Sequence, residues 1–247
     1  MTETFLTPGG RRIAFARTGG RAPGVIFLGG FRSDMTGTKA LALEAWARAG
    51  GRAFLRFDYS GHGASSGRFE DGAIGDWLAD ARAMLGLAEG PQVLVGSSMG
   101  GWIALLLARS MPERVAGLVT VAAAPDFTED IWAAMNREER ARLAAEGAVA
   151  IPSAHAAEPH VITRRLIEEA RDHLVLTAPL HLAVPVRFLQ GEADTEVPVA
   201  VALRLLGHAG GPDIRLTIVK GADHRFSTPD CLRLLTATVE EVLARAA

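Results

Sequence analysis

Residues 93–102 have the residue types and the spacing of a nucleophile elbow. An apolar run stops at Gly96-Ser97-Ser98-Met99-Gly100 and resumes as a helical pattern. A strand that turns sharply into a helix forces the middle residue into a strained backbone conformation, and glycines two positions away on either side leave room for it. The spacing predicts that Ser98 presents its hydroxyl as a nucleophile, the alternative being a structural turn without chemistry.

A serine hydroxyl is a weak nucleophile until a base takes its proton, so the elbow predicts an acid and a histidine in the chain order Ser, Asp, His. Asp194 follows the strand-like run 186–190, and His224 follows the next such run, 214–219. Because the carboxyl ends of parallel strands meet at one edge of a sheet, we expect Asp194 to orient His224 and His224 to deprotonate Ser98.

The plainer interpretations are a helix cap or Asx turn for Asp194 and a solvated surface side chain for His224. Glu192, Glu196 and Asp223 are the nearest competing acids. We prefer Asp194 because Asp223 adjoins the histidine and would point away from it, and because the turn geometry favours the aspartate over the two glutamates that flank it on the same loop.

Two backbone N–H groups are expected to bind the oxyanion. One belongs to Met99, at the start of the helix after the elbow, and the other to Phe31, in the loop 29–35. The glycines before Phe31 free that backbone, although an ordinary glycine turn would use them equally. Arg32 is either a solvated side chain or a contact for an anionic leaving group such as a glucuronate.

A second glycine-rich loop, 58–67, has part of the spacing of a dinucleotide-binding loop. Its third glycine comes one residue late, and no later acidic ribose ligand is evident. We therefore predict a structural turn and leave His62 and Ser65 outside the site. No histidine pair has the helical spacing of a metal site, so neither a metal nor a cofactor is expected.

Short apolar runs alternate with helical patterns along the chain. The predicted strands are 12–17, 24–28, 53–57, 92–95, 115–122, 186–190 and 214–219, and the predicted helices are 38–49, 76–87, 101–109, 199–206 and 229–246. This order predicts an α/β fold, with a mostly parallel sheet covered by helices on both faces.

Residues 1–247 are expected to form one domain, because no repeat, low-complexity tract or long linker divides them. The segment 125–185 interrupts the alternation with two predicted helices, 129–146 and 161–171, around the Pro- and His-containing stretch 151–160. Its position between two strands predicts a lid-like insertion above the site, the alternative being a plain surface crossover.

Composition excludes several classes of function. The chain is 49% hydrophobic with a net charge of −2, and its arginines are scattered, so we expect no nucleic-acid binding. No apolar run approaches the roughly 20 residues that span a bilayer, and residues 1–5 show no targeting signal, so we expect a cytoplasmic protein without stable membrane insertion. The single cysteine, Cys231, excludes an internal disulfide. The sequence gives no indication of the oligomeric state.

Four segments together resemble one known family. They are 30–40 (Gly-Phe-Arg-Ser-Asp-Met-Thr-Gly-Thr-Lys-Ala), 56–67, 95–102 and 222–225. Over nearly the whole chain, the sequence resembles the α/β-hydrolases typified by mitochondrial palmitoyl-protein thioesterases that also act as acyl-glucuronide esterases. The resemblance implies an α/β-hydrolase fold and a serine hydrolase of esters or thioesters, with Ser98, Asp194 and His224 on the family's triad positions. Because residues 1–5 do not read as a mitochondrial presequence, we expect a bacterial-type relative.

The expected substrate is a small-molecule ester or an acylated protein. Two other classes stay open: a different chemistry on the same fold, such as C–C bond hydrolysis or a lyase reaction, and a non-catalytic binding module. A binding module would ordinarily have lost one of the three triad residues, all of which are present here. A structural interaction protein is disfavoured because no repeat or exposed heptad is found.

Overall fold

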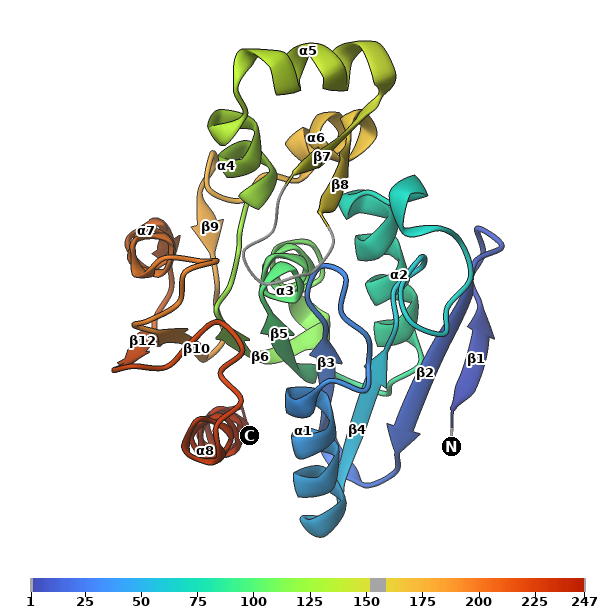
Figure 1. Ribbon diagram of the computed structural model, residues 1–247. Helices are drawn as coiled ribbons and strands as arrows, with labels where there is room; N and C mark the ends of the chain where they lie inside the picture. Colours follow the sequence, from blue (N-terminus) through green and yellow to red (C-terminus); the bar gives the residue numbers. More distant parts are fainter. Residues whose placement is uncertain (1, 152–158, 247) are drawn as a thin grey trace.

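A computed structural model describes residues 2–151 and 159–246 and is built on one mixed sheet (Figure 1). The strand order is β1-β2-β4-β3-β5-β6-β10-β12. The strands are β1 (Glu3–Leu6), β2 (Arg12–Thr18), β3 (Arg21–Leu28), β4 (Arg52–Phe57), β5 (Gln92–Ser97), β6 (Val115–Val121), β10 (Val186–Gly191) and β12 (Ile214–Val219). Neighbours from β4 to β12 pair in parallel, whereas β1 with β2 and β2 with β4 are antiparallel. The predicted, mostly parallel sheet is confirmed, and β1 is an additional edge strand that was not predicted.

Helices cover both faces of this sheet. The helices that follow individual strands are α1 (Thr38–Ala49), α2 (Ile74–Gly86), α3 (Met99–Ser110), α7 (Val199–His208) and α8 (Pro229–Arg245). Along β3, Val25 and Phe27 join the apolar cluster of α1 and α8, while Ile26 and Leu28 join that of α2 and α3. Alternate side chains of a strand point to opposite faces, so a central strand must be apolar throughout. None of the described helices is long and apolar enough to cross a membrane.

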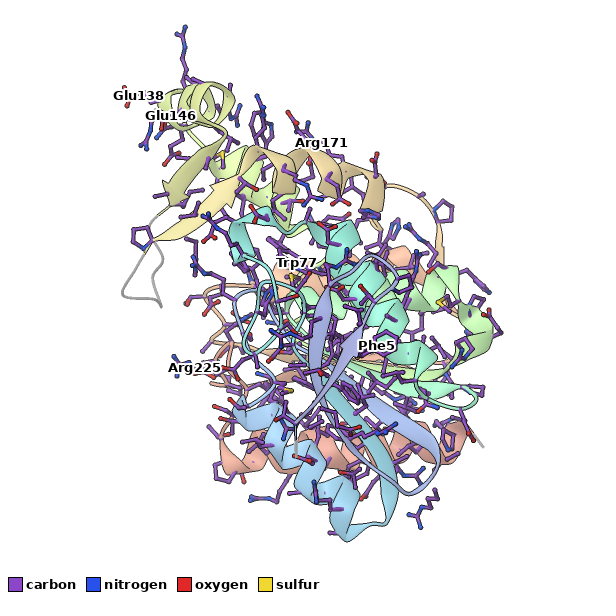
Figure 2. The ribbon with its side chains drawn as sticks, turned by 90° about the vertical axis from the view of Figure 1, so that its right-hand side faces the viewer. Phe5, Trp77, Glu138, Glu146, Arg171 and Arg225 are labelled. Atoms are coloured by element: carbon purple, nitrogen blue, oxygen red, sulfur yellow. The ribbon has the colours of Figure 1, made fainter. Side chains whose placement is uncertain are left out.

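The segment 125–185, called the insertion below, leaves the sheet after β6 and returns at β10. Figure 1 shows its helices and hairpin above the edge of the sheet where the parallel strands end. Its main elements are α4 (Phe127–Ala134), α5 (Arg137–Glu146), β7 (Ala148–Ile151), β8 (His160–Thr163) and α6 (Arg164–Ala170). Figure 2 shows Glu138 and Glu146 of α5 at the outer end of the insertion, where both are exposed. The insertion also contains the 3₁₀ turn Arg171–His173 and the short strand β9 (Leu180–His181), which pairs with β11 (Ala209–Gly210) outside it. Two further 3₁₀ turns lie outside the insertion, at Phe69–Asp71 and Pro112–Arg114.

Both helices predicted within the insertion differ from those observed. The predicted helix 129–146 is two helices, because the Asn136 side chain accepts from Glu139 N and the Glu139 side chain accepts from Asn136 N, at 2.9 and 2.8 Å. This capping box starts a new helix. The predicted helix 161–171 begins only at Arg164, since β8 pairs with β7 as an antiparallel hairpin. Most of the stretch 151–160, namely 152–158, lies outside the described residues.

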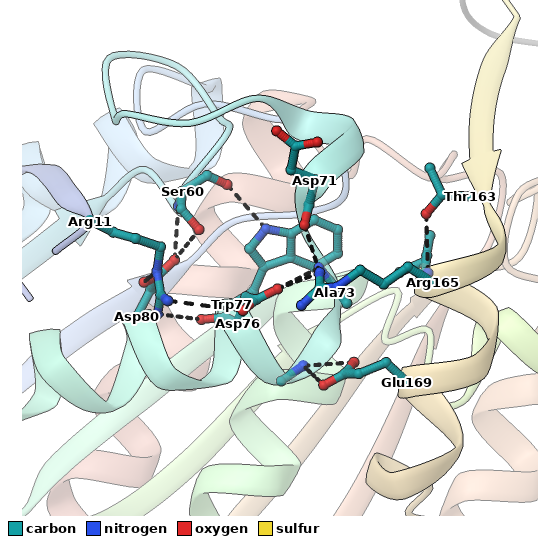
Figure 3. A network of polar contacts seen from close by, with 12 residues as sticks. Arg11, Ser60, Asp71, Ala73, Asp76, Trp77, Asp80, Thr163, Arg165 and Glu169 are labelled. Atoms are coloured by element: carbon teal, nitrogen blue, oxygen red, sulfur yellow. Dashed lines mark hydrogen bonds and ion pairs between the residues drawn. The ribbon is translucent and has the colours of Figure 1, made fainter. Parts of the chain in front are cut away.

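Polar contacts fix α6 of the insertion to α2 of the sheet domain (Figure 3). Glu169 accepts two hydrogen bonds from Gly75 N, at 2.9 and 3.1 Å. Arg165 makes an ion pair of 2.6 Å with Asp76. Deeper in the same network, the fully buried Asp80 accepts from Arg11 Nε at 2.8 Å. The contacts of Glu169 and Arg165 hold the returning half of the insertion against α2, and the bond between Arg11 and Asp80 ties α2 to the residue that precedes β2.

Asp126 joins the two ends of the insertion, and its removal is expected to destabilise the protein. Its buried carboxylate accepts from Val175 N and Leu176 N, each at 2.9 Å. The Asp126→Ala change leaves both donors without this acceptor, so we expect the free energy of unfolding to fall by about 2 to 4 kcal/mol. Urea denaturation measures it, with Asp130→Ala on the exposed face of α4 as the control. A loss of stability no larger than that of the control would contradict this role.

Candidate active site

Ser98 lies at a sharp turn between β5 and α3, as the elbow spacing predicts. Its backbone is left-handed, with φ +54° and ψ −117°. A Cβ at Gly96 would lie 2.3 Å from the Gly100 carbonyl oxygen, and one at Gly100 would lie 2.1 Å from that of Leu28. Between Gln92 and Ala108 every residue is buried except Ser98, which is partly exposed. The turn therefore makes Ser98 the one partly exposed residue of the otherwise buried stretch 92–108.

The loop after β3 approaches this serine closely. A Cβ at Gly30 would lie 3.4 Å from the Ser98 Cβ, so the backbone around Phe31 is next to the hydroxyl. Arg32 N donates to His62 Nε2 at 3.3 Å, whereas Phe31 N makes no hydrogen bond within the described part of the chain. The Phe31 ring is fixed against Phe69, with ring centroids 4.7 Å apart. Of the two adjacent N–H groups, only that of Phe31 is left to bind an oxyanion.

Asp194 and His224 meet beyond the ends of β10 and β12. His224 Nδ1 lies 2.9 Å from Asp194 Oδ2. The other carboxylate oxygen, Oδ1, accepts from the backbone N–H of Glu196 and Val197, at 2.9 and 2.8 Å. Burial alone would raise the pKa of the Asp194 carboxyl, but the hydrogen bonds from His224 and the backbone outweigh burial and lower it. An ionised carboxylate accepts the Nδ1 proton, which leaves Nε2 free of a proton in neutral His224.

Two of the three competing acids have other partners, and the third contacts the other ring nitrogen of His224. Glu192 pairs with Lys220. Asp223 Oδ1 accepts from Phe226 N at 3.0 Å. Glu196 Oε2 lies 3.5 Å from His224 Nε2, on the side of the ring opposite Asp194. Asp194 is therefore the acid that contacts Nδ1 of the histidine, and Glu196 is a second carboxylate at the nitrogen that would accept a proton.

A cavity of about 1180 Å³ brings these groups together. Ser98, His224, Phe31 and the insertion all contribute to its wall. The apolar lining from the insertion consists of Phe127, Ile131, Ala134, Met135, Ile151 and Ile162. The hydroxyl and the imidazole thus open into a space large enough for an acyl chain and walled by apolar side chains. Within residues 2–151 and 159–246, no three His, Cys, Asp or Glu side chains are grouped as a metal site requires.

Comparison with known proteins assigns this arrangement to a family. The model of the family described as serine aminopeptidase S33 (Hydrolase_4) matches residues 23–177, more than half of the chain. The chain belongs to this family of α/β-hydrolases. It is also 36% identical to the mouse mitochondrial palmitoyl-protein thioesterase ABHD10 over 233 residues, which cover 94% of this chain and 78% of that protein.

Solved structures agree with this assignment. The crystal structure of a protein described as a hydrolase from Agrobacterium vitis S4 has a TM-score of 0.94 and 40% identity, and the match covers 98% of each chain. The mouse α/β hydrolase domain-containing protein 10 has a TM-score of 0.93 and 33% identity over 100% of both chains. The α/β-hydrolase fold and the family resemblance expected from the sequence are confirmed.

Sequence reasoning missed three supporting residues of this α/β-hydrolase. His62, assigned to a structural turn, does hold a turn, but its ring also fixes the loop of Phe31 through Arg32 N. Gln190, inside β10, donates to Asp194 Oδ2 at 3.0 Å. Lys39 lines the cavity from the first turn of α1. The only sequence signal for Gln190 was its polar side chain within a largely apolar strand. The roles of His62 and Lys39 depend on contacts between distant segments of the chain, which the sequence does not reveal.

Proposed function

We propose that this α/β-hydrolase cleaves carboxylic esters or thioesters through an acyl-enzyme on Ser98. The Ser98 oxygen attacks the substrate carbonyl carbon while His224 Nε2 takes the hydroxyl proton, and Asp194 stabilises the resulting imidazolium. The N–H groups of Phe31 and Met99 bind the oxyanion. The leaving alcohol or thiol takes the proton from His224. Water then attacks the acyl-enzyme by the same route and releases the acid and the free serine.

One observation carries this proposal: the hydrogen bond between Asp194 and His224 lies at the wall of the cavity to which Ser98 is exposed. The alternatives fit less well. A binding module needs no base oriented by a buried carboxylate. C–C bond hydrolysis and lyase reactions require polar groups around the substrate's reacting carbons, whereas the insertion supplies mainly apolar side chains above the serine.

The acyl part of the substrate is proposed to occupy the apolar part of the cavity. The name of the ABHD10 relative, palmitoyl-protein thioesterase, supports a thioester of a long acyl chain and a protein cysteine as the substrate class. A small-molecule ester with the same acyl chain would meet the same wall. We keep the cytoplasm as the proposed location.

Chain-length dependence tests the proposed substrate class. With p-nitrophenyl esters and acyl-CoA thioesters from C2 to C16, we expect kcat/KM to rise with chain length, since burying each methylene is worth about 0.8 kcal/mol. Ile131→Trp fills part of the apolar wall, so we expect it to lower kcat/KM for C12 to C16 by about tenfold while leaving C2 nearly unchanged.

Leu203→Trp, at a side chain that is 53% exposed, is the control and should keep the wild-type profile. A wild-type profile that falls with chain length would exclude the long-chain assignment but keep the hydrolase proposal. Failure of Ser98 to react with a fluorophosphonate probe would instead argue against the hydrolase proposal and favour a binding module.

A further inference from the structure

Lys39 is an unusual residue for this chain. Of the 26 lysine and arginine residues, only two are lysines, Lys39 and Lys220. Lys220 is exposed and pairs with Glu192. Lys39 lies in the first turn of α1 and lines the same cavity as Ser98 and His224. None of the catalytic roles proposed above uses it.

Lys39 connects helix α1 to the loop that carries His224. Its Nζ donates to the Arg225 carbonyl oxygen at 2.6 Å, across 186 positions of sequence. Arg225 directly follows His224, so this bond holds the histidine's own loop against the helix that follows the loop of Phe31. Figure 2 shows Arg225 at the outer edge of the molecule, where the residue is exposed.

The loop of His224 needs support at this point. Phe226 is fully buried with a left-handed φ of +49°, a conformation that bulky residues adopt only when their surroundings hold it. From inside, Phe226 N donates to the Asp223 carbonyl oxygen and to Asp223 Oδ1, at 3.2 and 3.0 Å. From the cavity side, Lys39 holds the intervening carbonyl of Arg225. The turn that carries the imidazole is thus fixed from two sides.

The charge on Lys39 depends on pH within an ordinary working range. Burial lowers the pKa of the Lys39 ammonium to about 8. The charged groups that face it are Asp223 and Arg225 on the histidine loop and Asp194 and Glu196 on the neighbouring loop. The three carboxylates oppose the lowering of the pKa, and the guanidinium adds to it. The group is therefore mostly an ammonium ion at neutral pH and a neutral amine in mildly alkaline solution.

We propose that Lys39 is a positioning residue of this hydrolase: its ammonium holds the Arg225 carbonyl and thereby keeps the His224 imidazole oriented toward Ser98. The inference rests on the proposed function. It predicts an effect on turnover rather than on folding, because one hydrogen bond at a cavity wall adds little to a core held by residues such as Phe226. Small displacements of a catalytic group cost far more in rate, up to about a hundredfold for 1 Å.

The test compares Lys39→Met, Lys39→Arg and the control Lys220→Met in the full chain, with a p-nitrophenyl ester. We expect Lys39→Met to lower kcat by about tenfold to a hundredfold with unchanged KM and melting temperature. Lys39→Arg keeps a charged donor and should restore most of kcat. Lys220→Met should match the wild type. A kcat within twofold of the wild type for Lys39→Met would overturn the proposal.

The pH profile separates positioning from a merely structural contact. Below pH 8 the wild-type Lys39 is charged, and above it the donor is a neutral amine, so kcat should fall as pH rises through about 8. The arginine variant stays charged, so this fall should disappear. If Lys39→Met does not fold, Lys39→Arg decides: an unchanged fall near pH 8 overturns the proposal, and its loss supports it. Turnover by Ser98→Ala would instead overturn the hydrolase proposal itself.

Discussion

Replacing Ser98 with alanine is expected to lower kcat on the order of 10⁶-fold, because the nucleophile and its base act as a unit and neither is effective alone. The fold should be unaffected. Ser98 makes no side-chain cap to α3, and alanine tolerates the left-handed turn no worse than serine does. The melting temperature should therefore match that of the wild type.

Initial rates with a p-nitrophenyl ester measure this effect, and covalent labelling by a fluorophosphonate should be lost in the same variant. Ser110→Ala is the matched control, because Ser110 ends the same helix and, among the residues that the structure describes, its hydroxyl hydrogen-bonds only to Leu106 O and Arg82. The control should retain wild-type turnover and labelling. Purified Ser98→Ala with a rate near that of the wild type would show that the serine is not the nucleophile.

Asp194→Asn is expected to lower kcat by about 10⁴-fold through the histidine tautomer. Oδ1 of Asp194 accepts two backbone N–H groups, so the asparagine oxygen should remain there. Its NH₂ group would then face His224 Nδ1 and the NH₂ group of Gln190. His224 can accept that donor only with Nδ1 unprotonated, which places its proton on Nε2. The ring then cannot take the proton of Ser98.

Single-turnover and steady-state rates across neutral pH measure this loss, and the KM should change far less than kcat. Glu192→Gln is the control, since Glu192 lies on the same loop but pairs with Lys220. It should keep wild-type activity. If Asp194→Asn remains active and Glu196→Gln does not, the carboxylate at Nε2 is the important one, and the assignment of the acid must be reversed.

Much of the candidate site could be predicted from local sequence. The spacing of Gly96, Ser98 and Gly100 follows from the steric requirement of a single turn. It can therefore be recognised without knowing the rest of the molecule. Asp194 and His224 could be placed because parallel strands end at one edge, so residues after successive strands become neighbours. Their roles stay predictions until the variants are measured.

The insertion was predicted less well. Its polar composition indicated helices, but the boundary between α4 and α5 depends on the Asn136 capping box, which has only a short local signal. The hairpin of β7 and β8 was missed because four-residue strands carry too little periodicity to be distinguished from helix. The fixed position of α6 depends on Arg165 and Glu169, whose partners lie on α2.

The sequence alone determined the parallel α/β architecture, the serine at the elbow, and the order in which an acid and a histidine follow it. These features depend on periodicity, turn sterics and strand order, which act over a few residues or follow a general rule of topology. The tertiary structure alone decided which carboxylate contacts His224 Nδ1, that Gln190 supports it, and that Lys39 holds the next carbonyl. Those contacts join segments that only long-range packing brings within hydrogen-bond distance.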